Sequence, residues 1–402
     1  MNKVIMLFID AFSSKYLDSS KTPLLTEVSR KGYYTPLKPM FAFQGIGASI
    51  FSGTSPNLNN IWCDWVLKRG VNKLHPTSLR YFLMMSELIP NDRLSKDCRY
   101  ILYKVYSCDF GTPNLVPHKL LSNFELKLKK SYLEKNSLGE ISTIFEQLTR
   151  FNKKYIVYGI DNSCTDDDAI KKLFESLKAE YDLYLIKLSS LDSLGHQHGP
   201  NSNEVQERLI KIDTQVRYIL KYIQNSNDSI HLVIFSDHGM SYVSNHVNLT
   251  NILKKTSLNM SEDYIVFLDS TVARFWFFNN NAKNRIINEI SQLTCGKILN
   301  KHELINFDID NIGYEYGELF FALNEGYVFH PDFFRRHNPP KGMHGYAYPN
   351  DKPVLIIKSP DKGVTYTTQS EAQLTDIMPT VLDLLEIPIP ITCEGTSLLE
   401  TH

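Results

Sequence analysis

The sequence predicts an α/β fold with a mostly parallel central sheet, helices on both faces, and an inserted cap subdomain. Three observations support this prediction. Short apolar runs rich in β-branched residues alternate with segments of helical periodicity, which is typical of a parallel sheet covered by helices. Acidic and histidine side chains follow several of these runs directly, at expected strand ends. Two long stretches interrupt the alternation, and we interpret them as insertions.

Five apolar runs are the predicted strands of this sheet. They are VIMLFI (4–9), YIVYGI (155–160), LYLIKL (183–188), HLVIFS (231–236) and PVLIIK (353–358). The clearest predicted helix covers 203–224, because apolar residues recur there at alternating steps of four and three. Further helices are predicted at 167–179, 283–293 and 371–385.

The chain of 402 residues is long enough for one large α/β domain with an inserted subdomain. Residues from about 64 to 150 are rich in Leu, Lys, Ser and Tyr, and residues from about 255 to 340 mix aromatic runs with Asn-rich turns. Neither stretch follows the strand and helix alternation. We expect both insertions to form a cap over the sheet, where substrate choice would be made.

Composition restricts the classes of partner. The formal net charge is −1, so no overall field favours nucleic acid or a charged membrane surface, and a small molecule recognised locally is expected. No segment approaches the roughly 20 apolar residues that cross a bilayer. Six scattered cysteines, without a C-x-x-C pair, indicate reduced thiols in a cytoplasmic protein.

Six side chains suited to metal binding stand just after predicted strands or in a glycine-flanked loop. They are Asp10, Asp192, His196, Asp237, His238 and His344. Zinc binds imidazole nitrogen and carboxylate oxygen, and three protein ligands leave a position open for substrate or water. Two such ions about 4 Å apart can hold a phosphoryl group between them. Six ligands therefore fit two divalent ions, zinc first and manganese or iron as alternatives.

These residues lie in the motifs SDHGM, LDSLGHQHGP and GMHGY. Together with the strand-terminal Asp10 and the ending TDIMPTVLDLLEIPIPITCEGTSLL, the motifs resemble the alkaline phosphatase superfamily, most closely its nucleotide pyrophosphatase/phosphodiesterase branch. The resemblance covers nearly the whole chain. It implies a single catalytic domain over 1–402 that cleaves a phosphodiester, pyrophosphate or related ester of a small molecule.

The resemblance also implies how the six ligands are shared. In the family pattern, Asp192, His196 and His344 would bind one zinc ion, and Asp10, Asp237 and His238 would bind the other. The neighbouring His198 falls on a variable position of the D-S-x-G-H-x-x-G-P pattern, so it is left out of the metal site.

The nucleophile segment departs from the family pattern. SGTSPNLNNI (52–61) matches the end of that segment, and the family spacing then places Phe43 where a Thr or Ser nucleophile is expected. A shift of one residue would place Gln44 there, whose amide can donate a hydrogen bond to a phosphoryl oxygen. Ser49 lies roughly 9 Å further along the helix. Cys63 is expected to be a buried structural thiol.

Two further features of this region bear on anion binding. Gly45 and Gly47, at the start of the predicted helix, would allow close approach of an anion to backbone N–H groups. Asp64 falls near the position where the phosphodiesterase branch often has an Asn that binds a phosphoryl oxygen. A carboxylate there would repel phosphate unless it is protonated, metal-bound or paired with a cationic group.

Phe43 leaves three hypotheses open. In the first, which we favour, metal-bound hydroxide attacks the substrate directly. In the second, the attacking group belongs to another substrate, or the ester differs, giving a phosphoryl, sulfuryl or nucleotidyl transferase or a sulfur or phosphonate ester hydrolase. In the third, the protein is an inactive metal-binding homologue. The oligomeric state is left open.

Overall fold

The computed structural model describes residues 2–41, 45–68, 77–106, 114–160, 164–360 and 364–400. Its largest sheet has seven strands in the order β17-β2-β16-β7-β1-β6-β5. The strands are β1 (Asn2–Ile9), β2 (Tyr33–Lys38), β5 (Tyr155–Tyr158), β6 (Leu183–Leu188), β7 (Ser229–Phe235), β16 (Val354–Lys358) and β17 (Ala372–Gln373). β7, β1, β6 and β5 run parallel, whereas β16 is antiparallel to both neighbours. The predicted α/β fold is confirmed, with a mixed sheet.

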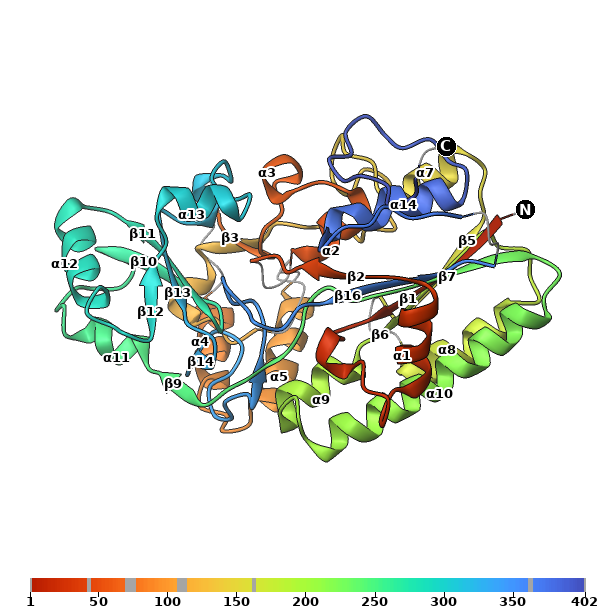
Figure 1. Cartoon of the computed structure of the whole chain (residues 1–402). Helices are drawn as coiled ribbons and strands as arrows, with labels where there is room; N and C mark the ends of the chain where they lie inside the picture. The colour runs from red at the N-terminus through yellow and green to blue at the C-terminus, as the bar shows by residue number, and fades with distance from the viewer. Residues whose placement is uncertain are drawn as a thin grey trace.

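Helices cover both faces of this sheet (Figure 1). One face carries α2 (Ile46–Ser52), α7 (Ile144–Arg150) and α14 (Ile377–Leu384), and the other carries α1 (Pro23–Lys31), α8 (Asp166–Ser176), α9 (Ser190–His198) and α10 (Asn203–Asn225). Successive side chains of a strand point to opposite faces. In β1, Val4, Met6 and Phe8 accordingly join one hydrophobic cluster, and Ile5, Leu7 and Ile9 join the other.

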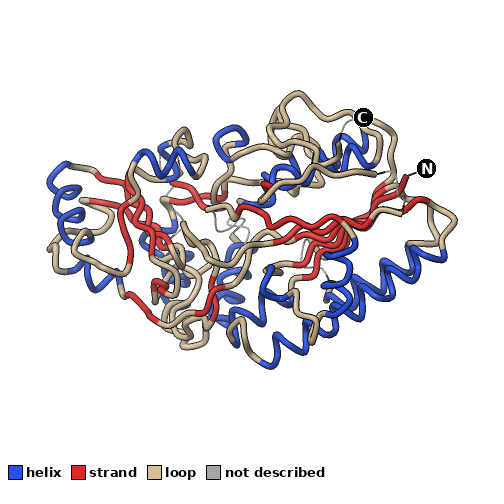
Figure 2. Tube along the Cα trace, in the orientation of Figure 1, coloured by secondary structure: helices blue, strands red, loops and turns tan. Residues whose placement is uncertain are grey.

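A second group of strands lies apart from the main sheet (Figure 2). It is an antiparallel sheet of β10 (Tyr264–Leu268), β11 (Val272–Phe277), β13 (Leu319–Leu323) and β12 (Gly296–Ile298). Around it lie α4 (Thr77–Ser86), α5 (Asp92–Val105), α6 (His118–Leu121), α11 (Leu249–Lys254), α12 (Asn280–Ile290), α13 (Lys301–Asn306), β3 (Trp65–Leu67) and β4 (Phe124–Leu126). Residues of both insertions share one hydrophobic cluster, in which the Phe124 and Phe267 rings lie 4.9 Å apart.

Short elements complete the described chain. They are the 3-10 helices η1 (Ser14–Tyr16), η2 (Tyr314–Tyr316) and η3 (Leu374–Asp376), helix α3 (Pro56–Asn59), and strands β8 (Ser241–Tyr242), β9 (Asn245–Val247), β14 (Tyr327–Phe329) and β15 (Gly342–Met343). β15 pairs with β8, and β14 with β9.

Some predicted boundaries were wrong. The helix predicted at 371–385 begins only at Ile377, because Ala372 pairs with Leu37 at the sheet edge and η3 follows. The helices predicted at 167–179 and 283–293 each lie a few residues earlier, since Thr165 and Asn279 cap their first turns. The strand predicted at 155–160 ends at Tyr158. Helix α7, inside the first predicted insertion, packs on the main sheet through Phe145 and Leu148.

The parallel strands end at the same edge of the sheet. β1 pairs with β6 in a register that places Ile9 beside Leu188, and with β7 in one that places Phe8 beside Phe235. Residues directly after the three strands therefore lie next to one another, and this position brings together most of the predicted ligands.

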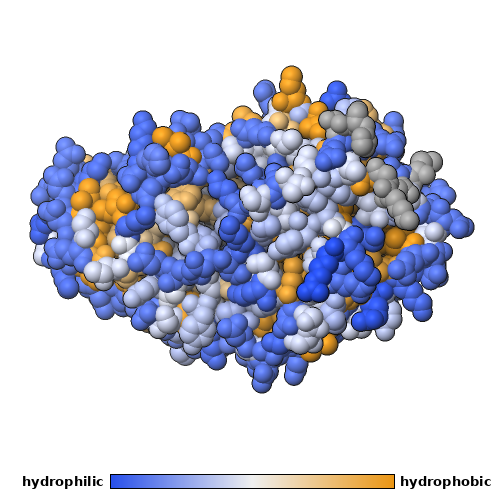
Figure 3. All heavy atoms as spheres, viewed as in Figure 1, coloured by the Kyte–Doolittle hydropathy of each residue, from blue (hydrophilic) through white to orange (hydrophobic). Residues whose placement is uncertain are grey.

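The surface facing the viewer is mostly hydrophilic, with hydrophobic side chains in small separate groups (Figure 3). Among the described residues no helix combines the length and apolarity needed to cross a membrane. The five cysteines in the described ranges are all free thiols: Cys63, Cys98, Cys164, Cys295 and Cys393.

Candidate functional site

Asp10 opens the site, directly after β1. Its backbone N–H donates to the Leu188 carbonyl at 3.0 Å, which ties the turn to the end of β6. The next residue, Ala11, has φ of 61°, a left-handed conformation that costs energy for a residue with a β-carbon. This turn directs the buried Asp10 side chain toward the neighbouring strand ends, where its Oδ1 lies 3.3 Å from His238 Nε2.

Helix α9 supplies Asp192 and His196 from one side, since residues four apart share a helix face. His196 Nδ1 lies 2.8 Å from the Gly342 carbonyl oxygen, which fixes the ring. Its Nε2 then lies 3.4 Å from Asp192 Oδ1. His344, directly after β15, brings its Nε2 to 3.7 Å from the same oxygen. The three predicted ligands of one metal are thus together.

Asp237 and His238 follow β7 on irregular backbone. His238 Nδ1 lies 2.9 Å from the Gly239 carbonyl oxygen, and its Nε2 lies 3.3 Å from Asp10 Oδ1 and 3.5 Å from Asp237 Oδ2. Gly239 is needed for space, because a β-carbon there would lie 2.6 Å from Asp351 Oδ2. The His238 and His344 rings stack with centroids 3.6 Å apart, so the two ligand groups adjoin.

The geometry of these six residues fits divalent metal ions. Two groups have ligand atoms within 4.8 Å of one another: Asp192 with His196 and His344, and Asp10 with Asp192 and His238. Buried oxygens Asp10 Oδ1 and Asp192 Oδ1 accept no hydrogen bond from the described residues, which is unfavourable without a cation. Asp192 belongs to both groups, whereas Asp237 lies beside the second. The assignment of three ligands to each ion stays a prediction.

Burial shifts the pKa values of these ligands. Burial, and then the Asp10 charge, raise the pKa of Asp192 to about 7. Burial, and then the Arg335 charge, lower the pKa of His196 to about 3, and burial lowers that of His344 well below its usual value. These two imidazoles are therefore neutral at neutral pH, which is the form that binds metal.

Lys187 joins the site although sequence reasoning missed it. Its Nζ lies 2.8 Å from Asp10 Oδ2 and 4.7 Å from the centre of the Phe8 ring. Burial alone would lower the pKa of Lys187, but the charges of Asp10 and Asp237 outweigh it, and the pKa is raised. A lysine inside the apolar run LYLIKL was the signal in the sequence.

The nucleophile segment is described only in part. Phe43 and Gln44 lie outside the described residues. Helix α2 begins at Ile46 after the N-cap Gly45, close to the predicted start. The two glycines serve packing here, which corrects the expectation of close anion approach. A β-carbon on Gly45 would collide with the Trp62 carbonyl, and one on Gly47 would lie 2.9 Å from the Tyr132 ring.

The alternative nucleophiles are in structural positions. Ser49 is fully buried, and its Oγ accepts a hydrogen bond from Asn59 Nδ2 at 3.3 Å. Cys63 is buried in the cluster between the sheet and α2, as expected. Asp64 has a pKa raised to about 6, first by burial and then by the charge of Asp269. A raised pKa is one of the conditions under which this carboxyl group could tolerate a phosphate.

The remaining histidines near matched motifs lie elsewhere in the structure. His198 Nδ1 is 3.3 Å from Glu204 Oε1 at the end of α9, which agrees with leaving His198 out of the metal site. The His246 and His330 ring centres are 5.9 Å apart, and His337 Nε2 is 4.0 Å from Asp92 Oδ1.

Comparisons with known proteins agree with this site and fold. Murine ectonucleotide pyrophosphatase/phosphodiesterase 5 superposes with a TM-score of 0.70 at 15% identity, over 99% of this chain and all of that one, and an inactive variant of it has been solved with AMP. Mouse ectonucleotide pyrophosphatase/phosphodiesterase family member 7 is 29% identical over 111 residues, covering 26% of this chain and 25% of that protein.

A second kind of relative matches over a shorter stretch. GPI ethanolamine phosphate transferase 2 of Schizosaccharomyces pombe is 32% identical over 93 residues, covering 22% of this chain and 12% of that protein. The chain thus spans a quarter or less of the length of these curated relatives. The match to a whole family is broader and covers residues 4–369. The chain belongs to the type I phosphodiesterase / nucleotide pyrophosphatase family, within the alkaline phosphatase superfamily, as its motifs indicated.

Proposed function

We propose that this chain is a two-metal phosphodiesterase, with zinc as the resident metal, that cleaves a phosphodiester or pyrophosphate bond of a small molecule. One observation carries the proposal. Six ligand side chains from four separate segments converge in two overlapping groups, and buried carboxylate oxygens among them have no hydrogen bond from the described residues. The proposal is also supported by membership of a family of phosphodiesterases and pyrophosphatases.

The ligand residues would be Asp192, His196 and His344 on one side and Asp10, Asp237 and His238 on the other. Divalent ions held there would stabilise charge on phosphoryl oxygens and lower the pKa of bound water. The chain's own contribution is orientation. The Gly342 and Gly239 carbonyls each fix one imidazole through Nδ1 and leave Nε2 facing the carboxylates.

We further propose water as the attacking group. Phe43 has no nucleophilic atom, and Ser49 and Cys63 are both buried in the core. Water oxygen would bond to phosphorus while the bond from phosphorus to the leaving oxygen breaks, and the leaving oxygen takes up a proton. No covalent intermediate with the protein is then formed.

Metal analysis and labelled water test these statements. We expect close to two ions per chain, and loss of metal and activity in Asp237→Ala and His344→Ala. His198→Ala is the matched control and should keep both, because His198 pairs with Glu204 outside the site. Hydrolysis of bis(4-nitrophenyl) phosphate in ¹⁸O-water should place label in the phosphate product without a trapped phosphoprotein. A folded, metal-free and fully active protein would contradict the proposal.

A second candidate function is transfer of the phosphoryl group to an acceptor other than water. The local matches to GPI ethanolamine phosphate transferases favour it. Adding an amino alcohol to the labelled-water reaction separates the two functions, because transfer gives a new diester without solvent label. Aryl sulfate and aryl phosphonate esters belong in the same assay, and lack of turnover of every ester would indicate an inactive homologue.

The location of the protein is a separate proposal. Five free cysteines among the described residues are compatible with a reducing compartment, and we propose a cytoplasmic one. Fractionation of cells that express the chain would test this.

A further inference from the structure

A pocket of about 430 Å³ lies between the first turns of α5 and the loop that leads to β15. Its lining includes Arg93, Lys96 and Asp97 from α5, and Phe334, Arg335 and Asn338 from the loop. None of these residues belongs to the six proposed metal ligands. The pocket therefore offers side chains that the proposed hydrolysis has not used.

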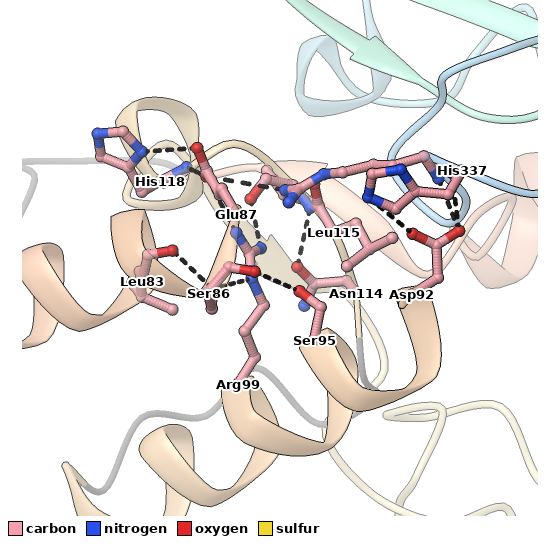
Figure 4. A network of polar contacts seen from close by, with 12 residues as sticks. Leu83, Ser86, Glu87, Asp92, Ser95, Arg99, Asn114, Leu115, His118 and His337 are labelled. Atoms are coloured by element: carbon pink, nitrogen blue, oxygen red, sulfur yellow. Dashed lines mark hydrogen bonds and ion pairs between the residues drawn. The ribbon is translucent and has the colours of Figure 1, made fainter. Parts of the chain in front are cut away.

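Polar contacts hold the loop and α5 together. Asp92 Oδ2 accepts the backbone N–H groups of Arg336 and His337 at 2.9 and 3.1 Å, and the view from close by shows this carboxylate facing His337 (Figure 4). Arg336 Nη2 also donates to the Leu115 carbonyl at 2.8 Å. Lys96 lies one helical turn after Asp92, so it is on the face of α5 that meets this loop.

The helix itself is anchored inside the cap. Glu87 Oε1 accepts from Arg99 Nη2 at 3.0 Å and from the His118 backbone N–H at 2.6 Å (Figure 4). Arg99 is fully buried and also donates through Nε to Ser86 Oγ at 2.9 Å. These contacts give α5 a fixed position against which the loop is docked, so the pocket is bounded by two held elements.

The Arg335 backbone is fixed from the other side. Asp332 Oδ1 accepts the N–H groups of Phe334 and Arg335 at 2.7 and 2.5 Å, and Asp332 Oδ2 accepts from Ser270 Oγ at 2.6 Å. Both oxygens of this buried carboxylate are therefore occupied. Asp332 holds the turn in place and forms no ion pair with Arg335 or Lys96 in the part of the chain that the structure describes.

Two cations in the pocket lack a counterion. Neither Lys96 Nζ nor the Arg335 guanidinium makes a hydrogen bond or ion pair with any described residue. They are also close to one another, because the Arg335 charge lowers the pKa of Lys96 in addition to the effect of burial. Like charges side by side are unfavourable unless an anion lies between them. Asp97 is the one acidic side chain in the lining that is exposed, beside the occupied Asp92.

Arg335 also borders the metal centre. Its charge lowers the pKa of His196 and of His344. The same loop continues to Lys341, whose N–H donates to the His196 carbonyl at 2.8 Å. A group bound by Arg335 would therefore lie next to the metal ligands, within reach of a substrate held there.

We infer that Arg335 and Lys96 form a subsite for a second anionic group of the substrate, a carboxylate or phosphate beyond the phosphorus that is cleaved. Arg335 would donate paired hydrogen bonds to this group, and Lys96 would add a point charge. The inference rests on the proposed function, since it assigns a substrate class to the same centre. The enzyme would prefer esters with an additional negative charge.

A matched pair of substrates tests this inference with the zinc-loaded protein. The pair is 4-nitrophenyl phenyl phosphate and the same diester with a 4-carboxyl group on the phenyl ring. We expect kcat/KM to favour the carboxylated ester by about tenfold to a hundredfold, the range of a charge-assisted hydrogen bond. Arg335→Gln should remove most of this preference, Lys96→Gln part of it, and Arg335→Lys should restore some. Lys104→Gln, an exposed cation later in α5, should leave it unchanged.

Binding supplies a readout that does not need turnover. Calorimetry with phenyl phosphate and 4-carboxyphenyl phosphate should show the same preference, and the same loss in Arg335→Gln and Lys96→Gln. If no ester is hydrolysed but this binding preference is present and lost in the variants, the proposed function is wrong and the subsite stands. Equal affinity of the wild type for both ligands, or an equal fall for both in Arg335→Gln, would overturn the subsite.

Discussion

Asp64→Asn is the perturbation whose effect on stability can be worked out most directly. Asp64 stands near the position where relatives often have Asn, and Asn matches its size without ionising. Burial and the neighbouring charge of Asp269 raise the pKa of Asp64 from 3.8 to about 6. Asp269 is itself buried and paired with Arg274 Nε at 2.8 Å, so it remains a fixed negative charge beside Asp64.

The sign follows from linkage. Because the folded pKa exceeds the unfolded one, the unfolded chain loses the Asp64 proton first as pH rises, and the folded state loses stability. One pKa unit corresponds to about 1.4 kcal/mol, so the full penalty is about 3 kcal/mol and is present above pH 6. About 1 kcal/mol of it already exists at pH 4.5. Removing the carboxyl group should therefore stabilise the protein by about 2 kcal/mol more at pH 8 than at pH 4.5.

Urea denaturation of the metal-free protein at pH 4.5, 6 and 8 measures this difference. The free energies of unfolding of Asp64→Asn and wild type should diverge as pH rises. Asp97→Asn, at an exposed position, is the control and should stay within about 0.5 kcal/mol of wild type at each pH. A difference for Asp64→Asn that does not change between pH 4.5 and 8 would refute the reasoning that Asp64 is desolvated next to Asp269.

Three further predictions concern other buried polar groups. Ser49→Ala should keep kcat/KM within about threefold and lose about 1 kcal/mol of stability from its hydrogen bond; inactivity of a folded variant would return Ser49 to consideration as nucleophile. Arg99→Met should destabilise the cap by about 3 to 5 kcal/mol, because it leaves Glu87 without its buried partner. Hydrogen exchange should then rise across α4 to α6, and unchanged exchange would contradict this. Lys187→Met should cost metal-free protein about 3 kcal/mol at pH 8 by leaving Asp10 unpaired, whereas a urea midpoint equal to wild type would show that the pair is not stabilising.

The sequence was sufficient where the signal was local. Asp192 and His196 lie four apart in one motif and therefore on one side of α9, and Asp10 follows an apolar run that could only be a buried strand. Register between neighbouring strands then brings their ends together without further information. The site and the central strands share this property, which is why both were predictable.

Features that depend on contacts between distant segments were not predictable. β17 exists because Ala372 pairs with the distant Leu37, and the predicted helix loses its first turns to that pairing. The glycines of α2 accommodate Trp62 and Tyr132, which no local pattern announces. Arg335 was missed for the same reason, since its place beside α5 follows from the contacts of Asp92 with the loop.

Charge balance connects the metal centre with the neighbouring subsite. The three carboxylates Asp10, Asp192 and Asp237 together with Lys187 carry a formal charge of −2 when the imidazoles are neutral. Two divalent ions would change this to +2, more than one phosphodiester monoanion can offset. Arg335 adds a further positive charge nearby. A substrate with a second anionic group would balance this excess better than a simple diester would. The excess of positive charge thus favours the substrate class assigned to Arg335 and Lys96, and the carboxylated diester is the compound on which it should be visible.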